Sequence, residues 1–87
     1  MEDTKIELSY SLGEGGNIQW VEETAFTVGA EGLLSVVMPD QTVVPVAQAD
    51  NQDAAAAAIA AIEARIKTVL RANGGGVEVI VIDDFLN

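Results

Sequence analysis

The chain has 87 residues and a net charge of −10, and it contains neither cysteine nor histidine. Without these two residue types it has no thiol nucleophile, no disulfide, no zinc site of the usual kind and no imidazole general base. A chain of this length is expected to form one small globular domain over residues 1–87.

The first part of the chain alternates between apolar and polar residues, as half-buried strands do. Residues 5–12 alternate cleanly and predict a first strand, and a glycine-rich hairpin loop follows over 13–17. The alternation resumes over 18–28 and predicts a second strand. Glu22 interrupts it, so a bulge or bend is expected near 21–23.

Two further strands are predicted before the helix. Residues 33–38 form the third, after a turn at 29–32, and residues 42–47 form the fourth, after a tight turn at Pro39. Pro45 has no N–H to donate, so the fourth strand is expected at an edge of the sheet.

Residues 54–72 give the one strong helix signal, because they are rich in alanine and carry an apolar stripe at helical spacing. The stripe that should face the core consists of Ile59, Ile62, Ile66, Val69 and Leu70. Asp50 or Asp53 is the expected N-cap, and the glycines after Asn73 are expected to end the helix.

Residues 77–83 predict a fifth strand whose nearly continuous apolar run favours a central position, covered on both faces. Phe85 and Leu86 are expected to fold back on the core. The predicted fold is therefore α+β: a mainly antiparallel sheet of about five strands with one helix packed on one face, in the order β-β-β-β-α-β. The helix stripe should meet strand residues Ile6, Leu8, Trp20, Phe26, Ile80 and Ile82.

No motif indicates catalysis, a cofactor or a metal. The glycines at 13–16 and 74–76 do not precede a helix, as a phosphate-binding loop requires. Residues 50–53 resemble the start of a calcium loop but lack its glycine and its final glutamate, so helix capping explains them better. Asp83 and Asp84 fit acids placed where a strand exits to solvent. We therefore expect a protein that is not an enzyme and binds no cofactor.

Two groups of residues are candidates for a protein interface. One helix covers only one face of a sheet, so spare apolar strand residues need another cover, unless the sheet curls on itself. These strand candidates are Leu33, Val37, Val43, Val77 and Val79. The other group is the small-residue face of the helix, which serves either close contact with a partner or helix propensity alone. It consists of Ala57, Ala60, Ala61 and Ala64.

The expected function is a non-enzymatic assembly or protein-interaction module that binds copies of itself or a larger assembly. A small viral structural accessory protein of the capsid decoration type would fit, which places the chain in a virion; otherwise the cytoplasm is expected, since the N-terminus has no signal-peptide pattern. Direct nucleic-acid binding and membrane binding are not expected, because the chain has no basic patch and no long apolar run.

The alternative function is an acidic inhibitor that presents carboxylates, in place of nucleic-acid phosphates, to a basic protein surface. It is suggested by the uneven charge of the chain. Residues 1–53 hold ten acids against Lys5 alone, a net charge of −9, whereas residues 54–87 hold four acids against three cations, a net charge of −1.

Overall fold

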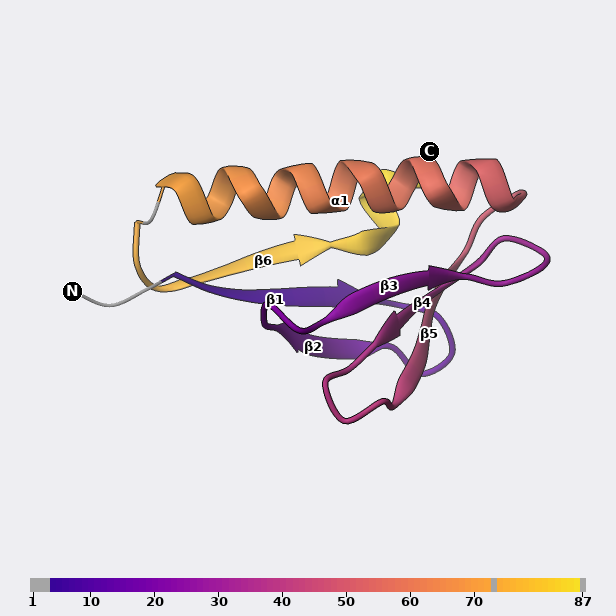
Figure 1. The fold of residues 1–87 in the computed structure, drawn as a ribbon, viewed down its shortest axis with the longest axis horizontal. Helices are drawn as coiled ribbons and strands as arrows, with labels where there is room; N and C mark the ends of the chain where they lie inside the picture. The colour runs from indigo at the N-terminus through magenta and orange to yellow at the C-terminus, as the bar shows by residue number, and fades with distance from the viewer. Residues whose placement is uncertain (1–3, 73, 87) are drawn as a thin grey trace.

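A computed structural model describes residues 4–72 and 74–86. One long helix runs along the length of the molecule, and the strands lie on one side of it (Figure 1). The elements in chain order are β1 (Lys5–Tyr10), β2 (Gly16–Trp20), β3 (Ala25–Val28), β4 (Leu33–Val37), β5 (Val43–Gln48), α1 (Gln52–Ala72), β6 (Val77–Val81) and the 3₁₀ helix η1 (Ile82–Phe85).

The strands form two three-stranded sheets. The mixed sheet has the order β2-β1-β6, in which β1 pairs antiparallel with β2 and parallel with β6. The antiparallel sheet has the order β3-β4-β5. The predicted α+β class with a single helix is confirmed for the described residues. The prediction of one sheet of about five strands is wrong.

The chain divides into two sheets at the point where a bulge is predicted. Residues 18–28 form parts of two strands, β2 and β3, that belong to different sheets. A tight turn separates them: the Thr24 N–H donates to the Val21 carbonyl at 3.0 Å, and the Val21 N–H donates to Thr24 Oγ1 at 3.1 Å. These reciprocal bonds satisfy the backbone while the chain changes direction, so the interrupting Glu22 marks a corner between sheets.

The second error concerns the last strand, which is predicted to be central. β6 lies at an edge of the mixed sheet, and Ile80 is its one buried residue. β-branched residues favour strands whether or not they are covered, so a run of valine and isoleucine does not by itself indicate burial.

The antiparallel sheet confirms the edge position predicted from Pro45, since β5 is an outer strand. The pairing of β4 with β5 shifts between Leu34 and Ser35: Ser35 faces Pro45 and Leu34 faces Ala47. The extra residue is Val46, and the shift turns both Val46 and Ala47 toward the core.

The predicted tight turn between these two strands is present and has one unexpected feature. The Gln41 N–H donates to the Met38 carbonyl at 2.8 Å, and Gln41 adopts a left-handed φ of 76°. The hydroxyl of Thr42 makes the larger contribution to stabilising the Asp40 carboxylate. The Thr42 N–H, which donates to Asp40 Oδ1 at 2.9 Å, makes the next largest. These hydrogen bonds hold the pKa of Asp40 below its ordinary value.

The core lies between α1 and the two sheets. Of the predicted helix stripe, Ile62, Ile66 and Val69 are buried and Ile59 is half-buried, but Leu70 is 39% exposed. The buried side of α1 continues toward its start through Ala55 and Ala58, which rotates the contact face away from Leu70. The predicted partners Ile6, Leu8, Ile80 and Ile82 are buried, whereas Trp20, Phe26, Phe85 and Leu86 pack around the core partly exposed.

The N-cap of α1 is Asn51, where Asp50 or Asp53 is predicted. Asn51 Oδ1 accepts the N–H of Ala54 at 2.8 Å, the bond that a capping side chain makes three residues into a helix. Because the helix begins at Gln52, Asp53 falls inside its first turn, where a carboxylate still complements the helix dipole.

Candidate functional site

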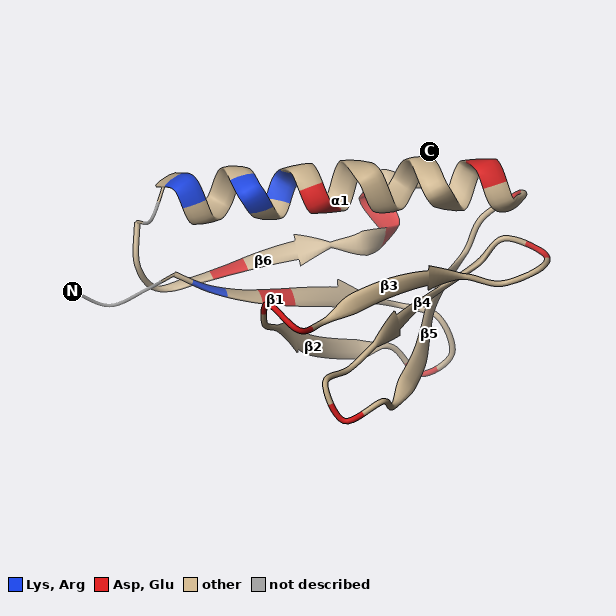
Figure 2. Cartoon of the chain, in the orientation of Figure 1, with Lys and Arg blue, Asp and Glu red and all other residues tan. Residues whose placement is uncertain are grey.

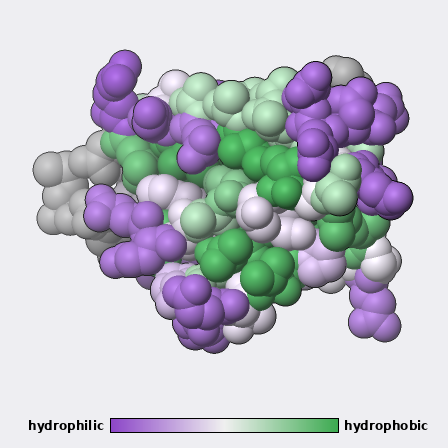
Figure 3. Space-filling model, turned by 45° about the vertical axis from the view of Figure 1, so that its right-hand side comes forward, coloured by the Kyte–Doolittle hydropathy of each residue, from purple (hydrophilic) through white to green (hydrophobic). Residues whose placement is uncertain are grey.

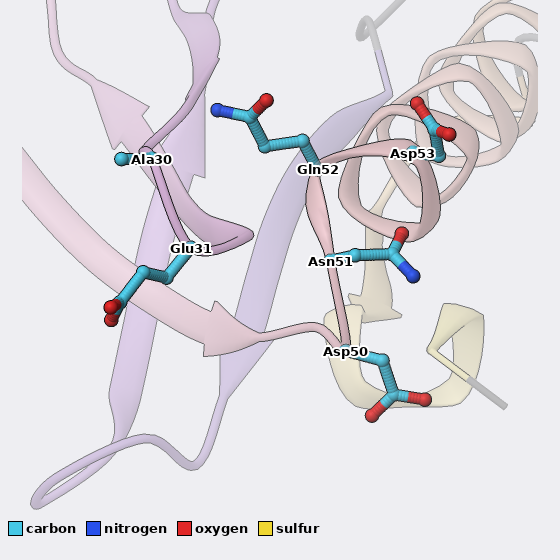
Figure 4. A pocket seen from close by; sticks show the side chains of 6 residues that line it. All are labelled: Ala30, Glu31, Asp50, Asn51, Gln52 and Asp53. Carbon is cyan, nitrogen blue, oxygen red and sulfur yellow. The ribbon is translucent and has the colours of Figure 1, made fainter.

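An open depression lies at the start of α1. It has a volume of about 600 Å³ and is lined by Ala30, Glu31, Asp50, Asn51, Gln52 and Asp53. The carboxylates of Glu31, Asp50 and Asp53 point in different directions (Figure 4). Gln52 Nε2 donates to the Gly29 carbonyl at 3.2 Å, so part of this polar lining joins the β3–β4 turn to the helix.

Carboxylates do not converge elsewhere in the described ranges either. Within residues 4–72 and 74–86, no group of three or more acids is placed to hold a metal ion. Asp83 accepts a hydrogen bond from the Ser11 hydroxyl, and its neighbour Asp84 is exposed. Asp83 therefore ties η1 to the chain just after β1.

A smaller hollow of about 220 Å³ lies between α1 and the β2–β3 corner. Trp20 and Leu70 contribute apolar lining, and charged residues Glu22, Glu63 and Lys67 surround them. Its size suits the insertion of one side chain more than a bound small molecule, since ligand pockets usually measure about 300–1,000 Å³.

The strand candidates for an interface do not form one surface. Leu33 and Val37 alternate with the fully buried Leu34 and Val36, and so lie on the outer face of the antiparallel sheet. Val43 pairs with Val37 there and is 55% exposed. Val77 and Val79 belong to the mixed sheet, so the spare apolar surface is divided between two sheets.

The helix candidates Ala57, Ala60, Ala61 and Ala64 are all exposed, on a side of α1 that the core does not use. In one view of the surface, hydrophobic residues gather in the middle of the face and hydrophilic residues stand around its rim (Figure 3). The alanines thus form a third surface, apart from the valines of β6 and the outer face of the antiparallel sheet.

The most exposed apolar row of the chain is on β6. Val77, Val79 and Val81 are 59%, 49% and 39% exposed. They are three of the five large apolar side chains that are exposed among the described residues, and they occupy alternate positions on one face of one strand. Their neighbours on β1 are the polar residues Lys5, Glu7 and Ser9, so the apolar row is confined to the edge of the sheet.

Within residues 4–72 and 74–86, no strand pairs with the outer edge of β6, so this edge presents free backbone groups. The Lys5 N–H donates to the Gly76 carbonyl at 2.8 Å, which fixes the side of the strand that faces β1. Backbone groups of successive residues point to opposite sides of a strand, so Glu78 and Ile80 bond toward β1. The N–H and C=O groups of Val77, Val79 and Val81 therefore point outward, away from the sheet.

The other sheet edges are protected in ways that β6 is not. β5 carries Pro45, and its pairing with β4 contains a register shift. The exposed residues of β2 are small or polar, namely Gly16, Asn17 and Gln19, and β3 has just four residues. Proline, bulges, polar residues and short length are the usual means of preventing unwanted strand pairing. Between Val77 and Val81, only the charge of Glu78 opposes it.

The charges near β6 are asymmetric. All four cations of the chain, Lys5, Arg65, Lys67 and Arg71, lie toward the end of the molecule where β6 begins (Figure 2). Asp83 and Asp84 lie in η1, just beyond the end of β6. Beside the start of β6 there is a groove of about 220 Å³, lined by Thr4, Arg65, Thr68, Val69, Ala72, Gly74, Gly75 and Glu78.

Sequence periodicity singles out Val77 and Val79 as surplus apolar residues but carries no signal for the free edge, which depends on which strands pair.

Comparison of the chain with protein-family models, curated proteins and solved structures finds no match. In the part of the chain that the structure describes, no helix combines the length and apolar character needed to cross a membrane.

Proposed function

We propose that this protein is a non-enzymatic interaction module that takes up an extended strand along the outer edge of β6. The observation that supports this proposal is the unguarded edge: outward-pointing backbone groups beside a row of exposed valines. Natural sheets rarely leave such an edge open, because it is a template for pairing with another chain.

Strand addition accounts for both features of the edge. The main-chain groups of Val77, Val79 and Val81 supply hydrogen bonds to any extended segment, whatever its sequence. The valine side chains then favour apolar or β-branched residues at every second position of the added strand, through cross-strand contact. Docking of many copies on a larger assembly, such as a viral capsid, is one setting in which a module of this kind would act.

The alternative, a mimic of nucleic-acid phosphates, receives less support from the distribution of the acids. Glu14, Glu31 and Asp40 lie in three different connections between strands, and Glu22 lies in a fourth (Figure 2). A mimic needs its carboxylates along one surface. Binding to a basic partner that weakens steeply between about 50 and 200 mM salt is the result that would favour it.

Strand addition is tested by closing the edge with Val79→Pro. Proline removes the outward N–H of residue 79 and leaves the β1–β6 bonds in place, so the fold should survive. We expect seven-residue peptides selected from a displayed library on the native chain to bind Val79→Pro at least tenfold more weakly, equivalent to about 1.4 kcal/mol. Fluorescence polarisation with the labelled peptides measures the difference.

Val79→Thr is the matched control, because threonine keeps the shape and the N–H of valine. It should weaken peptide binding much less than proline does. If the selected peptides bound the native chain and Val79→Pro equally well, strand addition at β6 would be rejected, and the hollow beside Trp20 and Leu70 would become the first surface to examine.

A further inference from the structure

We infer that the strand taken up by β6 is β6 of a second copy, paired antiparallel about a two-fold axis. This inference rests on the proposed function and names the partner of the same edge. A strand that pairs with its own copy about a two-fold axis must run antiparallel to it, and the two helices then lie on the same face of the joined sheet.

The sequence of β6 selects one register for this pairing. With Val79 opposite Val79 of the second copy, Val77 faces Val81 in both halves, and every outward N–H and C=O of the strand finds a partner. Glu78, the one charged residue of β6, then faces Ile80, so no two carboxylates oppose each other. Shifting the axis by one residue to Ile80 would place Val77 opposite Asp83 of the second copy. An apolar side chain would then face a carboxylate, which is unfavourable.

Charge complementarity supports the same arrangement. In an antiparallel pair the start of one β6 lies beside the end of the other. Asp83 is bonded to Ser11 of its own chain, but the exposed Asp84 of one copy then comes opposite Gly74 of the second. The groove there is bordered by Arg65 as well as Glu78, and it lies at the end of the molecule that carries the four cations (Figure 2). Five of the acids, namely Glu14, Glu22, Glu23, Glu31 and Asp40, lie in connections between strands and not on β6 or its flanks.

The contact is confined to one five-residue strand and its flanks. The area that such a contact buries is smaller than the total of roughly 1,200–2,000 Å² that specific stable interfaces bury. A small interface gives a weak affinity. We therefore expect a dissociation constant of roughly tens of micromolar, so that the dimer dissociates on dilution.

The register is tested with single cysteines, which are unambiguous reporters because the native chain contains none. Cα atoms of a hydrogen-bonded antiparallel pair are about 5.5 Å apart, within the range that a disulfide spans. Val79→Cys should therefore form a disulfide dimer under oxidised glutathione. Val77→Cys alone should not, since two copies of residue 77 would lie about 13 Å apart along the strands. A mixture of Val77→Cys and Val81→Cys should crosslink again.

Non-reducing electrophoresis and mass spectrometry measure these products, and circular dichroism checks that each variant is folded. All three positions are exposed, and the Val77→Cys and Val81→Cys mixture tests the register without changing residue 79. Failure of both Val79→Cys and the mixture to crosslink, with thiols that still react with a small reagent, would overturn the dimer. Equal crosslinking by Val77→Cys alone would overturn the register.

These results are distinguishable from failure of the proposed function. If the cysteines do not crosslink while selected peptides still bind the native chain and not Val79→Pro, the edge accepts a strand from a different protein and the inference of a second copy is wrong. If neither the cysteines nor the peptides engage β6, strand addition itself is wrong.

Discussion

Replacing Ile62 with alanine is expected to lower the free energy of unfolding by about 2–5 kcal/mol. Ile62 is 0% exposed and lies near the middle of α1, where it belongs to the core cluster that joins the helix to both sheets. The change removes buried methylene and methyl groups and leaves a cavity that rigid strands fill poorly. Because small domains are stabilised by only about 5–15 kcal/mol, this is a large share of the total.

Leu70→Ala is the control for this prediction. Leu70 is on the same helix but is 39% exposed, so its truncation should cost less than about 1 kcal/mol. Urea unfolding followed by circular dichroism gives both values. Equal losses for the two variants, or a loss below about 0.5 kcal/mol for Ile62→Ala, would contradict the observed orientation of α1.

Gly32→Ala is expected to destabilise the fold by a similar amount for a different reason. Gly32 has a φ of +85°, and a Cβ built on it would lie 2.6 Å from the Asn51 backbone oxygen. Asn51 is held as the cap of α1, and the Gly32 carbonyl accepts the Ala49 N–H at 3.0 Å, so neither segment is free to move aside. The left-handed conformation costs about 1–2 kcal/mol and the clash adds about 1–3 kcal/mol.

Gly13→Ala separates these two costs. Gly13 also has a left-handed φ, +66°, but an added Cβ there meets nothing within 4 Å. Its replacement should therefore show only the conformational cost, about 1–2 kcal/mol. Thermal and urea unfolding of the two variants measures the difference, which is the cost of the clash. If Gly32→Ala were no worse than Gly13→Ala, the close approach of the β3–β4 turn to the helix start would be wrong.

Local patterns in the sequence predict the local elements of this fold. The alanine-rich stretch with its apolar stripe predicts the helix, and Pro45 predicts the edge position of β5, because both signals depend on the residues themselves. The division into two sheets is not predictable in the same way. A turn such as Val21–Thr24 disturbs the apolar–polar alternation in the same way as a bulge within one strand. The two possibilities are distinguished only by the pairing of β2 and β3 with different partners.

The candidate site was predictable only in part for the same reason. The surplus of apolar residues identifies Val77 and Val79 without knowledge of the fold. The parallel pairing of β1 with β6 leaves the far side of β6 open, and this pairing joins residues that are 72 positions apart in the sequence, as Lys5 and Val77 are. The apolar run at 77–83 also gives rise to the prediction of a covered central strand. The wrong position of this strand and the missed edge therefore have one cause, which is that strand pairing cannot be read from the run itself.

Hydrogen exchange at the amide of residue 79 tests the free edge most directly. In dilute protein the Val79 N–H should exchange much faster than the N–H groups of Glu78 and Ile80, which bond toward β1. At concentrations where copies associate, the Val79 N–H should become protected while its neighbours change little, as residue-resolved NMR can show. A Val79 N–H that is already protected in the dilute monomer, or that stays unprotected when copies associate, would contradict pairing at the edge of β6.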